Sequence, residues 1–577
     1  MFGLLKYLGK FKKHAIYAPM LVALEVFFDV AIPMVMSKII DVGINGENGA
    51  DIGYILKMGG LMVLMSLAAM VTGALSGKEA ATAGAGFVRN LRVEVFTKIQ
   101  DFSFKNIDHF SVPSLVTRLT TDMRQIRLAF MMMVRMLVRA PLQLIFSFIM
   151  VAILNIRLAV VFVVAIPVLA IGLFFISYTA HPRFQVMMDK YDALNAALEE
   201  NLIGIRVVKT FVRGAFEKKK FGASSEDVMK QQRFAESIVI LNQPFFEFVM
   251  YMCMIAVSWF GGKSIIAGEM TVGQFMSYIT YIKMILFGLL NISFCLMQII
   301  MAQASVTRVN EIIDEKIDIT DDDADPTIKV EDGSIRFENV NFKYAADAEK
   351  YVLSDVNLDI KPGETVGILG STGSSKSTLV NLIPRLYDVT EGRVLVSGHD
   401  VRDYTLKNLR DGVAMVLQKN VLFSGTIEEN LKWGDENATR EQVVEAAKVA
   451  QADDFIMSFP QGYDTYIEQG GNNVSGGQKQ RLCIARALLK KPKIIILDDS
   501  TSAVDTDTDR RIREGLHTKL AGMTTIIIAQ RVASVMDADK ILIMADGRIK
   551  DMGTHAELME RNQAYRELYN SQMQGVE

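Results

Sequence analysis

Apolar residues are concentrated in the first half of the chain, where they form six long runs. A helix rises about 1.5 Å per residue, so about 20 apolar residues can cross the roughly 30 Å hydrocarbon core of a bilayer. Each run reaches that length, and the stretches between them are richer in charged residues. The pattern predicts six transmembrane helices, at residues 15–40, 52–75, 132–154, 158–178, 244–266 and 275–300.

Lysine and arginine are unevenly distributed among the segments that flank these runs. The N-terminal arm and the two long segments, 76–131 and 179–243, are basic. The other connections, at 41–51, 155–157 and 268–269, are short or acidic. Because basic loops remain on the cytosolic side, we place the N-terminus, both long segments and the C-terminal half in the cytosol.

The membrane half extends beyond the bilayer. Both long cytosolic segments keep a helical spacing of apolar residues and contain few breakers, so we expect the spans to continue as helices. Interruptions at 101–105 and 211–214 mark the two tips. Residues 1–14 mix lysines with apolar side chains, and no small-residue cleavage site follows, so they predict an interfacial elbow helix rather than a signal peptide. Residues 15–310 form the transmembrane domain.

The second half has a different pattern. Residues 311–333 are polar and acidic and predict a linker. Residues 334–577 follow as an α/β domain, in which Ile335–Phe342 alternates like a strand and Thr365–Leu369 reads as a short buried strand. A glycine-rich turn then leads into a helix from Lys376.

That turn has the form of a phosphate-binding P-loop. Its backbone N–H groups are expected to surround phosphates at a helix N-terminus. Lys376 would reach the β- and γ-phosphates, and the Ser377 hydroxyl would bind Mg²⁺. The motif requires glycine just before the lysine, and this chain has Ser375, whose Cβ disfavours the backbone angle needed there.

Composition argues against two classes of protein. The chain has 577 residues, of which 50% are hydrophobic, and its net charge of -3 offers no electrostatic basis for nucleic-acid binding. Its 3 cysteines do not predict a disulfide framework.

Two further motifs carry a family resemblance. Val474–Gln478, followed by Ile494–Asp499, resembles the signature loop and Walker B strand of ATP-binding-cassette (ABC) proteins. Glu200–Lys209 resembles a stretch of multidrug-type ABC exporters. The resemblance covers nearly the whole chain and implies six transmembrane helices with long intracellular extensions, fused to an α/β P-loop ATPase domain. It also implies that the two tips form coupling helices that contact nucleotide-binding domains.

The resemblance assigns ligands to individual residues. It implies that Tyr344 stacks on adenine, and that Mg²⁺ is held by Ser377, Gln418 and Asp498. It further implies that Glu468 lies near the coupling helices and that Ser502–Asp505 is the D-loop. The residues expected to contact ATP are Tyr344, Gly370, Ser371, Thr372, Gly373, Ser374, Ser375, Lys376, Ser377, Thr378, Gln418, Ser475, Gly476, Gly477 and Gln478.

Catalytic positions depart from the family pattern. Asp499 stands where the family has the glutamate that orients the attacking water, and Gln530 replaces the switch histidine. Aspartate is one methylene shorter, and glutamine carries no proton or positive charge at neutral pH. With Ser375, three groups that serve the chain's own nucleotide are altered, whereas the signature at Ser475 is intact.

That asymmetry suggests a heterodimer. In ABC proteins each ATP lies between one subunit's Walker motifs and the other's signature. The chain resembles the degenerate-site subunit of bacterial heterodimeric exporters, which implies ATP-driven export of hydrophobic or amphipathic compounds across the plasma membrane beside a second half-transporter. A lipid flippase, a peptide exporter and a regulatory, non-pumping ABC protein are the alternatives.

Charges inside the spans allow two interpretations. Glu25 and Asp29 lie four residues apart, on one face of the first predicted helix. They either form a polar patch facing a translocation cavity or are satisfied by basic or hydroxyl groups of another helix, and we favour the second. The 33 methionines likewise either line a soft cavity or pack as ordinary apolar residues, and again we favour the second.

Overall fold

The computed structural model describes residues 2–46, 49–345, 347–500, 504–519 and 522–573. The chain divides into two compact units. One contains residues up to 100 together with Val112–Asp314, and the other contains Asp101–Ser111 together with the residues from Glu315 onward. The tip at 101–111 therefore packs with the ATPase domain, although the sequence places it within the transmembrane domain.

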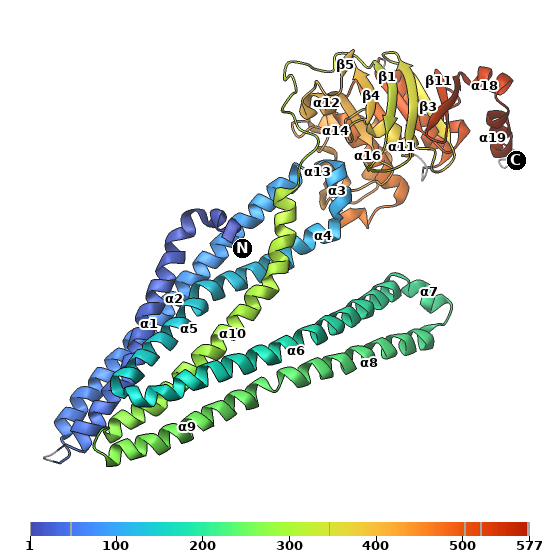
Figure 1. Ribbon diagram of the computed structural model, residues 1–577. Helices are drawn as coiled ribbons and strands as arrows, with labels where there is room; N and C mark the ends of the chain where they lie inside the picture. The colour runs from blue at the N-terminus through green and yellow to red at the C-terminus, as the bar shows by residue number, and fades with distance from the viewer. Residues whose placement is uncertain (1, 47–48, 346, 501–503, 520–521, 574–577) are drawn as a thin grey trace. The chain divides into compact units, whose positions relative to one another are not determined.

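The first unit is helical (Figure 1). Six helical runs of 42 to 53 residues are long and apolar enough to cross a membrane, which confirms the six predicted spans. The elements are η1 (Phe2–Phe11), α1 (Lys12–Lys38), η2 (Ile39–Ile44), α2 (Ile52–Gln100), α4 (Val112–Thr117), η3 (Arg118–Asp122), α5 (Met123–Leu154), α6 (Ile156–Ile203), α7 (Ile205–Thr210), α8 (Gly214–Val239), α9 (Asn242–Ile266) and α10 (Val272–Asp314).

The helices continue well past the predicted spans. The 49 residues of α2 correspond to a length of about 70 Å, more than twice the hydrocarbon thickness. The elbow is less regular than predicted. Residues Phe2–Phe11 form a 3₁₀ helix that bends at Gly9, and buried Leu4 and Leu8 anchor it.

The paired carboxylates in α1 have a basic partner. Arg139 of α5 donates one guanidinium nitrogen to Glu25 and another to Asp29, at 2.9 Å in the second case. A buried charge is tolerated when it is paired in this way. The structure thus supports the interpretation in which another helix satisfies the pair.

The second unit contains two main sheets. Its strands are β1 (Ile335–Phe342), β2 (Leu353–Ile360), β3 (Thr365–Gly370), β4 (Glu391–Val396), β5 (His399–Asp400), β6 (Val413–Val416), β7 (Gly425–Thr426), β8 (Tyr466–Ile467), β9 (Ile494–Asp498), β10 (Thr524–Ile528), β11 (Lys540–Ala545) and β12 (Arg548–Gly553). The larger sheet has the order β12-β11-β3-β10-β9-β6 and is parallel except for β12, and an antiparallel sheet has the order β2-β1-β4-β5.

The second unit also contains helices, and one of them, α3, comes from the first tip (Figure 1). They are α3 (Phe104–Phe110), α11 (Lys376–Asn381), α12 (Leu406–Gly412), α13 (Ile427–Leu431), α14 (Arg440–Val449), α15 (Asp453–Met457), α16 (Gly476–Leu489), α17 (Thr506–Lys519), α18 (His555–Arg561) and α19 (Gln563–Met573), with short 3₁₀ turns η4 (Gly462–Asp464), η5 (Gln469–Gly471) and η6 (Val532–Ser534). The predicted strands at 335–342 and 365–369 and the helix from Lys376 are confirmed.

Strand order explains how distant motifs come together. The P-loop follows β3, Gln418 follows β6, Asp499 follows β9 and Gln530 follows β10. Parallel strands have their carboxyl ends at one edge, where open α/β sheets bind ligands. The predicted linker begins later than expected, because α10 continues through Asp314.

Candidate functional site

The P-loop lies between β3 and α11. Lys376 folds back over the loop and donates hydrogen bonds to the carbonyl oxygens of Gly370 and Ser371, both at 2.9 Å. Gly370 has no room for a side chain, since a Cβ there would lie 2.4 Å from the carbonyl oxygen of Met544. The loop thus presents a cation at the N-terminus of a helix, an arrangement suited to phosphate groups.

Ser375 occupies the position where the motif requires glycine, and its backbone adopts φ +71°. This is the left-handed region, which costs a residue with a Cβ about 1 kcal/mol. The sequence predicted an unfavourable backbone angle at Ser375, and the structure has one there.

A carboxylate and a hydroxyl meet beside the loop. The Ser377 hydroxyl donates to Asp498 Oδ1 at 3.0 Å, so two of the three predicted Mg²⁺ ligands are in contact. The third, Gln418, is exposed just beyond β6, and its main-chain oxygen accepts a long hydrogen bond, of 3.5 Å, from Asn420 Nδ2. Oxygen ligands of this kind suit Mg²⁺.

Burial shifts the pKa values of two groups in this cluster. It raises the pKa of Asp498, an effect reinforced by the neighbouring Asp499 and opposed by the hydrogen bond from Ser377 and the charge of Lys376. Burial also lowers the pKa of Lys376, against the attraction of both aspartates. A divalent cation bound beside Asp498 would favour the ionised form of its carboxyl group.

The side chains of Asp499 and Gln530, the two predicted catalytic residues that depart from the family pattern, contact each other. Gln530 Nε2 donates to Asp499 Oδ2 at 2.9 Å. Asp499 has φ +48° and directly follows β9. The amide of Gln530 is therefore engaged by the carboxylate that replaces the expected glutamate.

Tyr344 lies at the end of β1, as the resemblance implies. Its side chain is 41% exposed, and its hydroxyl is 2.9 Å from the hydroxyl of Thr378 in α11. The ring stands edge-on to Phe342 and Tyr387, with centroids 4.9 Å and 5.1 Å away. An aromatic side chain that is supported from behind and open elsewhere can stack on a planar base.

The signature residues begin a different helix, α16. The Ser475 hydroxyl accepts from the backbone N–H of Gln478, and Gln478 Oε1 accepts from the N–H of Ser475 at 2.8 Å. This reciprocal cap leaves Ser475 and Gly476 exposed at the N-terminus of a 14-residue helix. Of the predicted D-loop, Ser502 and Ala503 lie outside the described residues.

The two tips differ in burial. Helix α3 has a capping box between Ser103 and Asn106, and Asn106 and Phe110 are buried. At the other tip, α7 has no buried residue, and the exposed fractions of Phe211 and Val212 just after it are 71% and 86%.

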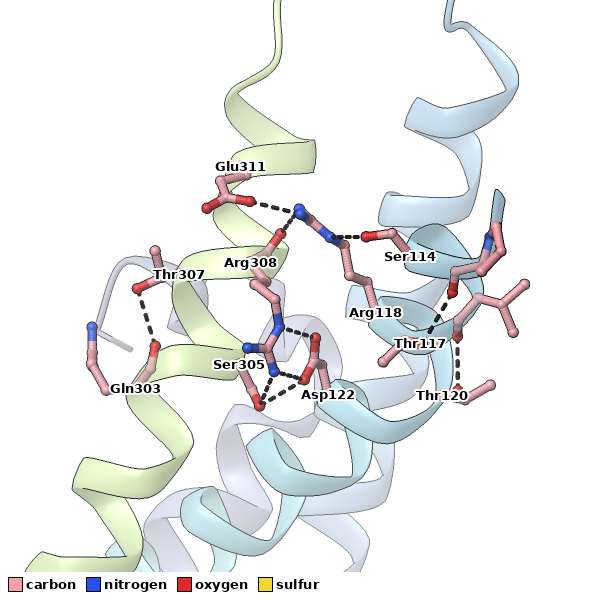
Figure 2. Close-up of polar contacts among 12 residues, drawn as sticks. Ser114, Thr117, Arg118, Thr120, Asp122, Gln303, Ser305, Thr307, Arg308 and Glu311 are labelled. Carbon is pink, nitrogen blue, oxygen red and sulfur yellow. Dashed lines mark hydrogen bonds and ion pairs between the residues drawn. The ribbon is translucent and has the colours of Figure 1, made fainter. Parts of the chain in front are cut away.

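Sequence reasoning missed a partly buried ion cluster between η3 and α10 of the membrane unit (Figure 2). Asp122, 1% exposed, accepts from Arg308 Nε and from the Ser305 hydroxyl, both at 2.8 Å. Arg118 pairs with Glu311 at 2.8 Å. These contacts join the π-helical turn η3 to the last turns of α10. Asp122 and Arg308 are 186 residues apart, and neither matches a motif.

Comparisons with known proteins cover both halves. Residues 15–290 match the family described as ABC transporter transmembrane region, and residues 353–502 match the family described as ABC transporter. An uncharacterized ABC transporter ATP-binding protein of Bacillus subtilis is 36% identical over 569 residues, 98% of each chain.

Two relatives have more specific names. An ATP-dependent lipid A-core flippase of Syntrophus aciditrophicus is 34% identical over 85% of this chain and 81% of its own length. A putative multidrug export ATP-binding/permease protein of Staphylococcus aureus is 37% identical over 72% of each chain.

A solved structure shares the whole architecture. It is that of a bacterial Atm1-family ABC exporter with ATP bound, which superposes with a TM-score of 0.84 at 26% identity and covers 97% of this chain and 99% of its own. With six membrane-spanning helices and an ABC ATPase domain in one polypeptide, this protein belongs to the ABC exporter family and is an ATP-driven, multi-pass membrane half-transporter whose ATPase domain is cytosolic.

Proposed function

We propose that this chain is the degenerate-site subunit of a heterodimeric exporter. The observation that carries the proposal is the contrast between two groups of residues. Asp499 and Gln530 replace the expected catalytic pair and bond to each other, whereas Ser475 opens α16 with a complete cap. The first group serves the nucleotide on this chain's own P-loop, and the second serves the partner's nucleotide.

The P-loop residues fit a nucleoside triphosphate. Lys376 is held over the loop by carbonyl oxygens that a phosphate oxygen could replace as its partner. Ser377 and Asp498 supply adjacent oxygens for Mg²⁺, with Gln418 as the third ligand. Tyr344 offers a half-exposed ring for adenine. Bound Mg²⁺ would neutralise phosphate charge and the paired aspartates.

The same residues predict slow turnover at this site. Orienting a water for in-line attack requires a hydrogen-bonding group within reach of that water, and Asp499 is shorter than the usual glutamate. Its carboxylate also accepts from Gln530. Both features favour retaining ATP over hydrolysing it.

The exposed apolar side chains at the tip around α7 favour contact with a second subunit. The apolar side chains around α7 include Ile203, Phe211 and Val212, all more than two-thirds exposed. Such a patch at the cytosolic end of a long helical hairpin is typical of a protein-binding surface. We infer that the partner's ATPase domain covers it.

The transported compounds are hydrophobic or amphipathic, either drug-like molecules or lipids. The names of the multidrug and lipid A-core relatives favour these two classes about equally. A lipid flippase is therefore the second candidate function.

Nucleotide retention tests the proposal. The tagged chain is purified from its native membranes with the subunit that accompanies it, loaded with radiolabelled ATP and Mg²⁺, and chased briefly. We expect one unhydrolysed ATP to remain per pair, together with transport-coupled hydrolysis at the other site. Full ATPase and transport activity of the chain assembled only with copies of itself would overturn the proposal. Hydrolysis without transport of any amphipathic compound would favour a regulatory protein instead.

A further inference from the structure

The contacts of Tyr387 connect the first tip with the nucleotide-binding residues. The side chain is 9% exposed and lies after α11, and its hydroxyl donates to Asp108 Oδ2 of α3 at 2.6 Å. Burial, the hydrogen bond to Asp108 and its negative charge raise the pKa of Tyr387, so the phenol stays protonated and keeps donating.

The ring of Tyr387 contacts two aromatic side chains from different parts of the unit. Phe104 of α3 approaches it edge-on, with centroids 6.0 Å apart. Tyr344 stands at 86° to it, with centroids 5.1 Å apart. Because packed interiors leave little free space, a displacement of the Tyr344 ring can reach α3 through Tyr387.

Tyr344 in turn bonds to the P-loop helix. Its hydroxyl is 2.9 Å from that of Thr378, the residue after Ser377. A continuous series of contacts thus runs from Asp108 through Tyr387 and Tyr344 to α11.

Helix α3 has other attachments that do not involve Tyr387. Asn106 Nδ2 donates to Glu315 at 2.8 Å and to the carbonyl oxygen of Lys316 at 3.0 Å. The rings of Phe102 and Phe110 stack with centroids 5.6 Å apart, and both residues are buried. These contacts hold α3 in place, so the Tyr387 hydroxyl is not required merely for attachment.

We propose that Tyr387 is a positioning residue that couples adenine contact at Tyr344 to the ordering of α3 through its hydrogen bond to Asp108. The proposal rests on the proposed role of Tyr344 in nucleotide binding. A contiguous set of contacts alone does not establish coupling, so the test must measure a response of α3 to nucleotide.

Hydrogen exchange of residues 101–111 provides that response. The full chain, purified with its accompanying subunit, is compared with and without Mg²⁺ and a non-hydrolysable ATP analogue. In the native protein we expect the analogue to slow exchange in α3. In Tyr387→Phe, which removes one hydroxyl, we expect this slowing to be lost while affinity for a fluorescent ATP analogue stays within about twofold. Transport per ATP hydrolysed should fall about fivefold or more.

Two variants serve as controls. Asp108→Asn keeps an oxygen acceptor and should retain most of the slowing. Tyr351→Phe removes another tyrosine hydroxyl bonded to a carboxylate, that of Glu391 at 3.0 Å, away from α3, and should behave like the native protein. Persistence of the slowing in Tyr387→Phe, or its equal loss in Tyr351→Phe, would overturn the proposal.

Tyr344→Ala separates this proposal from the one on which it rests. A large loss of nucleotide affinity in Tyr344→Ala supports the adenine contact. Unchanged affinity in Tyr344→Ala would reject both the adenine contact and the coupling proposal. Native-like slowing of exchange in Tyr387→Phe would reject the coupling proposal alone.

Discussion

The two groups of residues that we propose to contact nucleotide are built differently. On the Walker side, Ser375 is in a strained backbone conformation, and Asp499 and Gln530 bond to each other. On the signature side, Ser475 caps a regular helix with a reciprocal hydrogen-bond pair and an exposed N-terminus. A loop that only needs to hold ATP can tolerate strain and a shortened carboxylate, whereas a surface that stabilises charge developing at a partner's site cannot. Four variants can break or sharpen this comparison.

The largest effect is expected from Ser475→Arg. A long cation in place of the capping hydroxyl would block the N-terminus of α16, where the partner's γ-phosphate is expected to bind. We expect ATPase activity of the paired complex to fall about 100-fold or more, because removing one such contact already costs orders of magnitude. Steady-state ATPase measurements check this.

Thr439→Arg is the matched control for Ser475→Arg. Thr439 forms the same capping box at α14, with Gln442, and lies outside the proposed site. Losing that cap should reduce stability by about 1 kcal/mol and leave turnover nearly unchanged. Equal inactivation by the two variants would mean that Ser475 acts only as a cap.

Restoring the family residues should produce the next largest effect. In the double variant Asp499→Glu with Gln530→His, the longer carboxylate and an imidazole replace the bonded pair. We expect hydrolysis of the retained ATP to accelerate about tenfold, since general-base positioning accounts for at least that much. The fraction of ATP converted to ADP after a brief chase measures it, and an unchanged fraction would show that slow turnover has another cause.

A smaller effect is expected from Ser375→Gly. Glycine adopts φ +71° without a Cβ penalty, so the free energy of unfolding should rise by about 0.5–1 kcal/mol, with affinity for ATP up to about threefold higher. Thermal unfolding and fluorescent-nucleotide titration check both values. Ser371→Gly, at an exposed loop position outside the positive-φ residues, should instead be neutral or slightly destabilising.

The smallest effect is expected from Asp499→Asn. Because the proposed function assigns little hydrolysis to the Walker side of this chain, total ATPase activity of the pair should change by less than about twofold. Gln530 Nε2 can still donate to the asparagine side-chain oxygen. A loss as large as that of Ser475→Arg would contradict the division of labour between the two sides.

Much of the fold could be predicted because it depends on local patterns. Six apolar runs predicted six spans, and the P-loop at 370–377 was predicted from its residues, its place before a helix and the motifs that follow it. Ser375 was flagged from its position, and its positive φ followed. Two features of the elbow and linker were not predicted, the 3₁₀ geometry of Phe2–Phe11 and the continuation of α10 to Asp314, because ends of helices depend on packing.

The sequence by itself determined the membrane topology and the α/β nature of the second half, because these arise from neighbouring residues and their periodicity. It suggested the nucleotide motifs through a family resemblance. Only the tertiary structure decided which distant side chains meet: Arg139 with Glu25 and Asp29, and Asp108 with Tyr387, 279 residues away. Such pairs satisfy buried polar groups, and their partners are set by the convergence of separate helices and strands, which a single sequence does not encode locally.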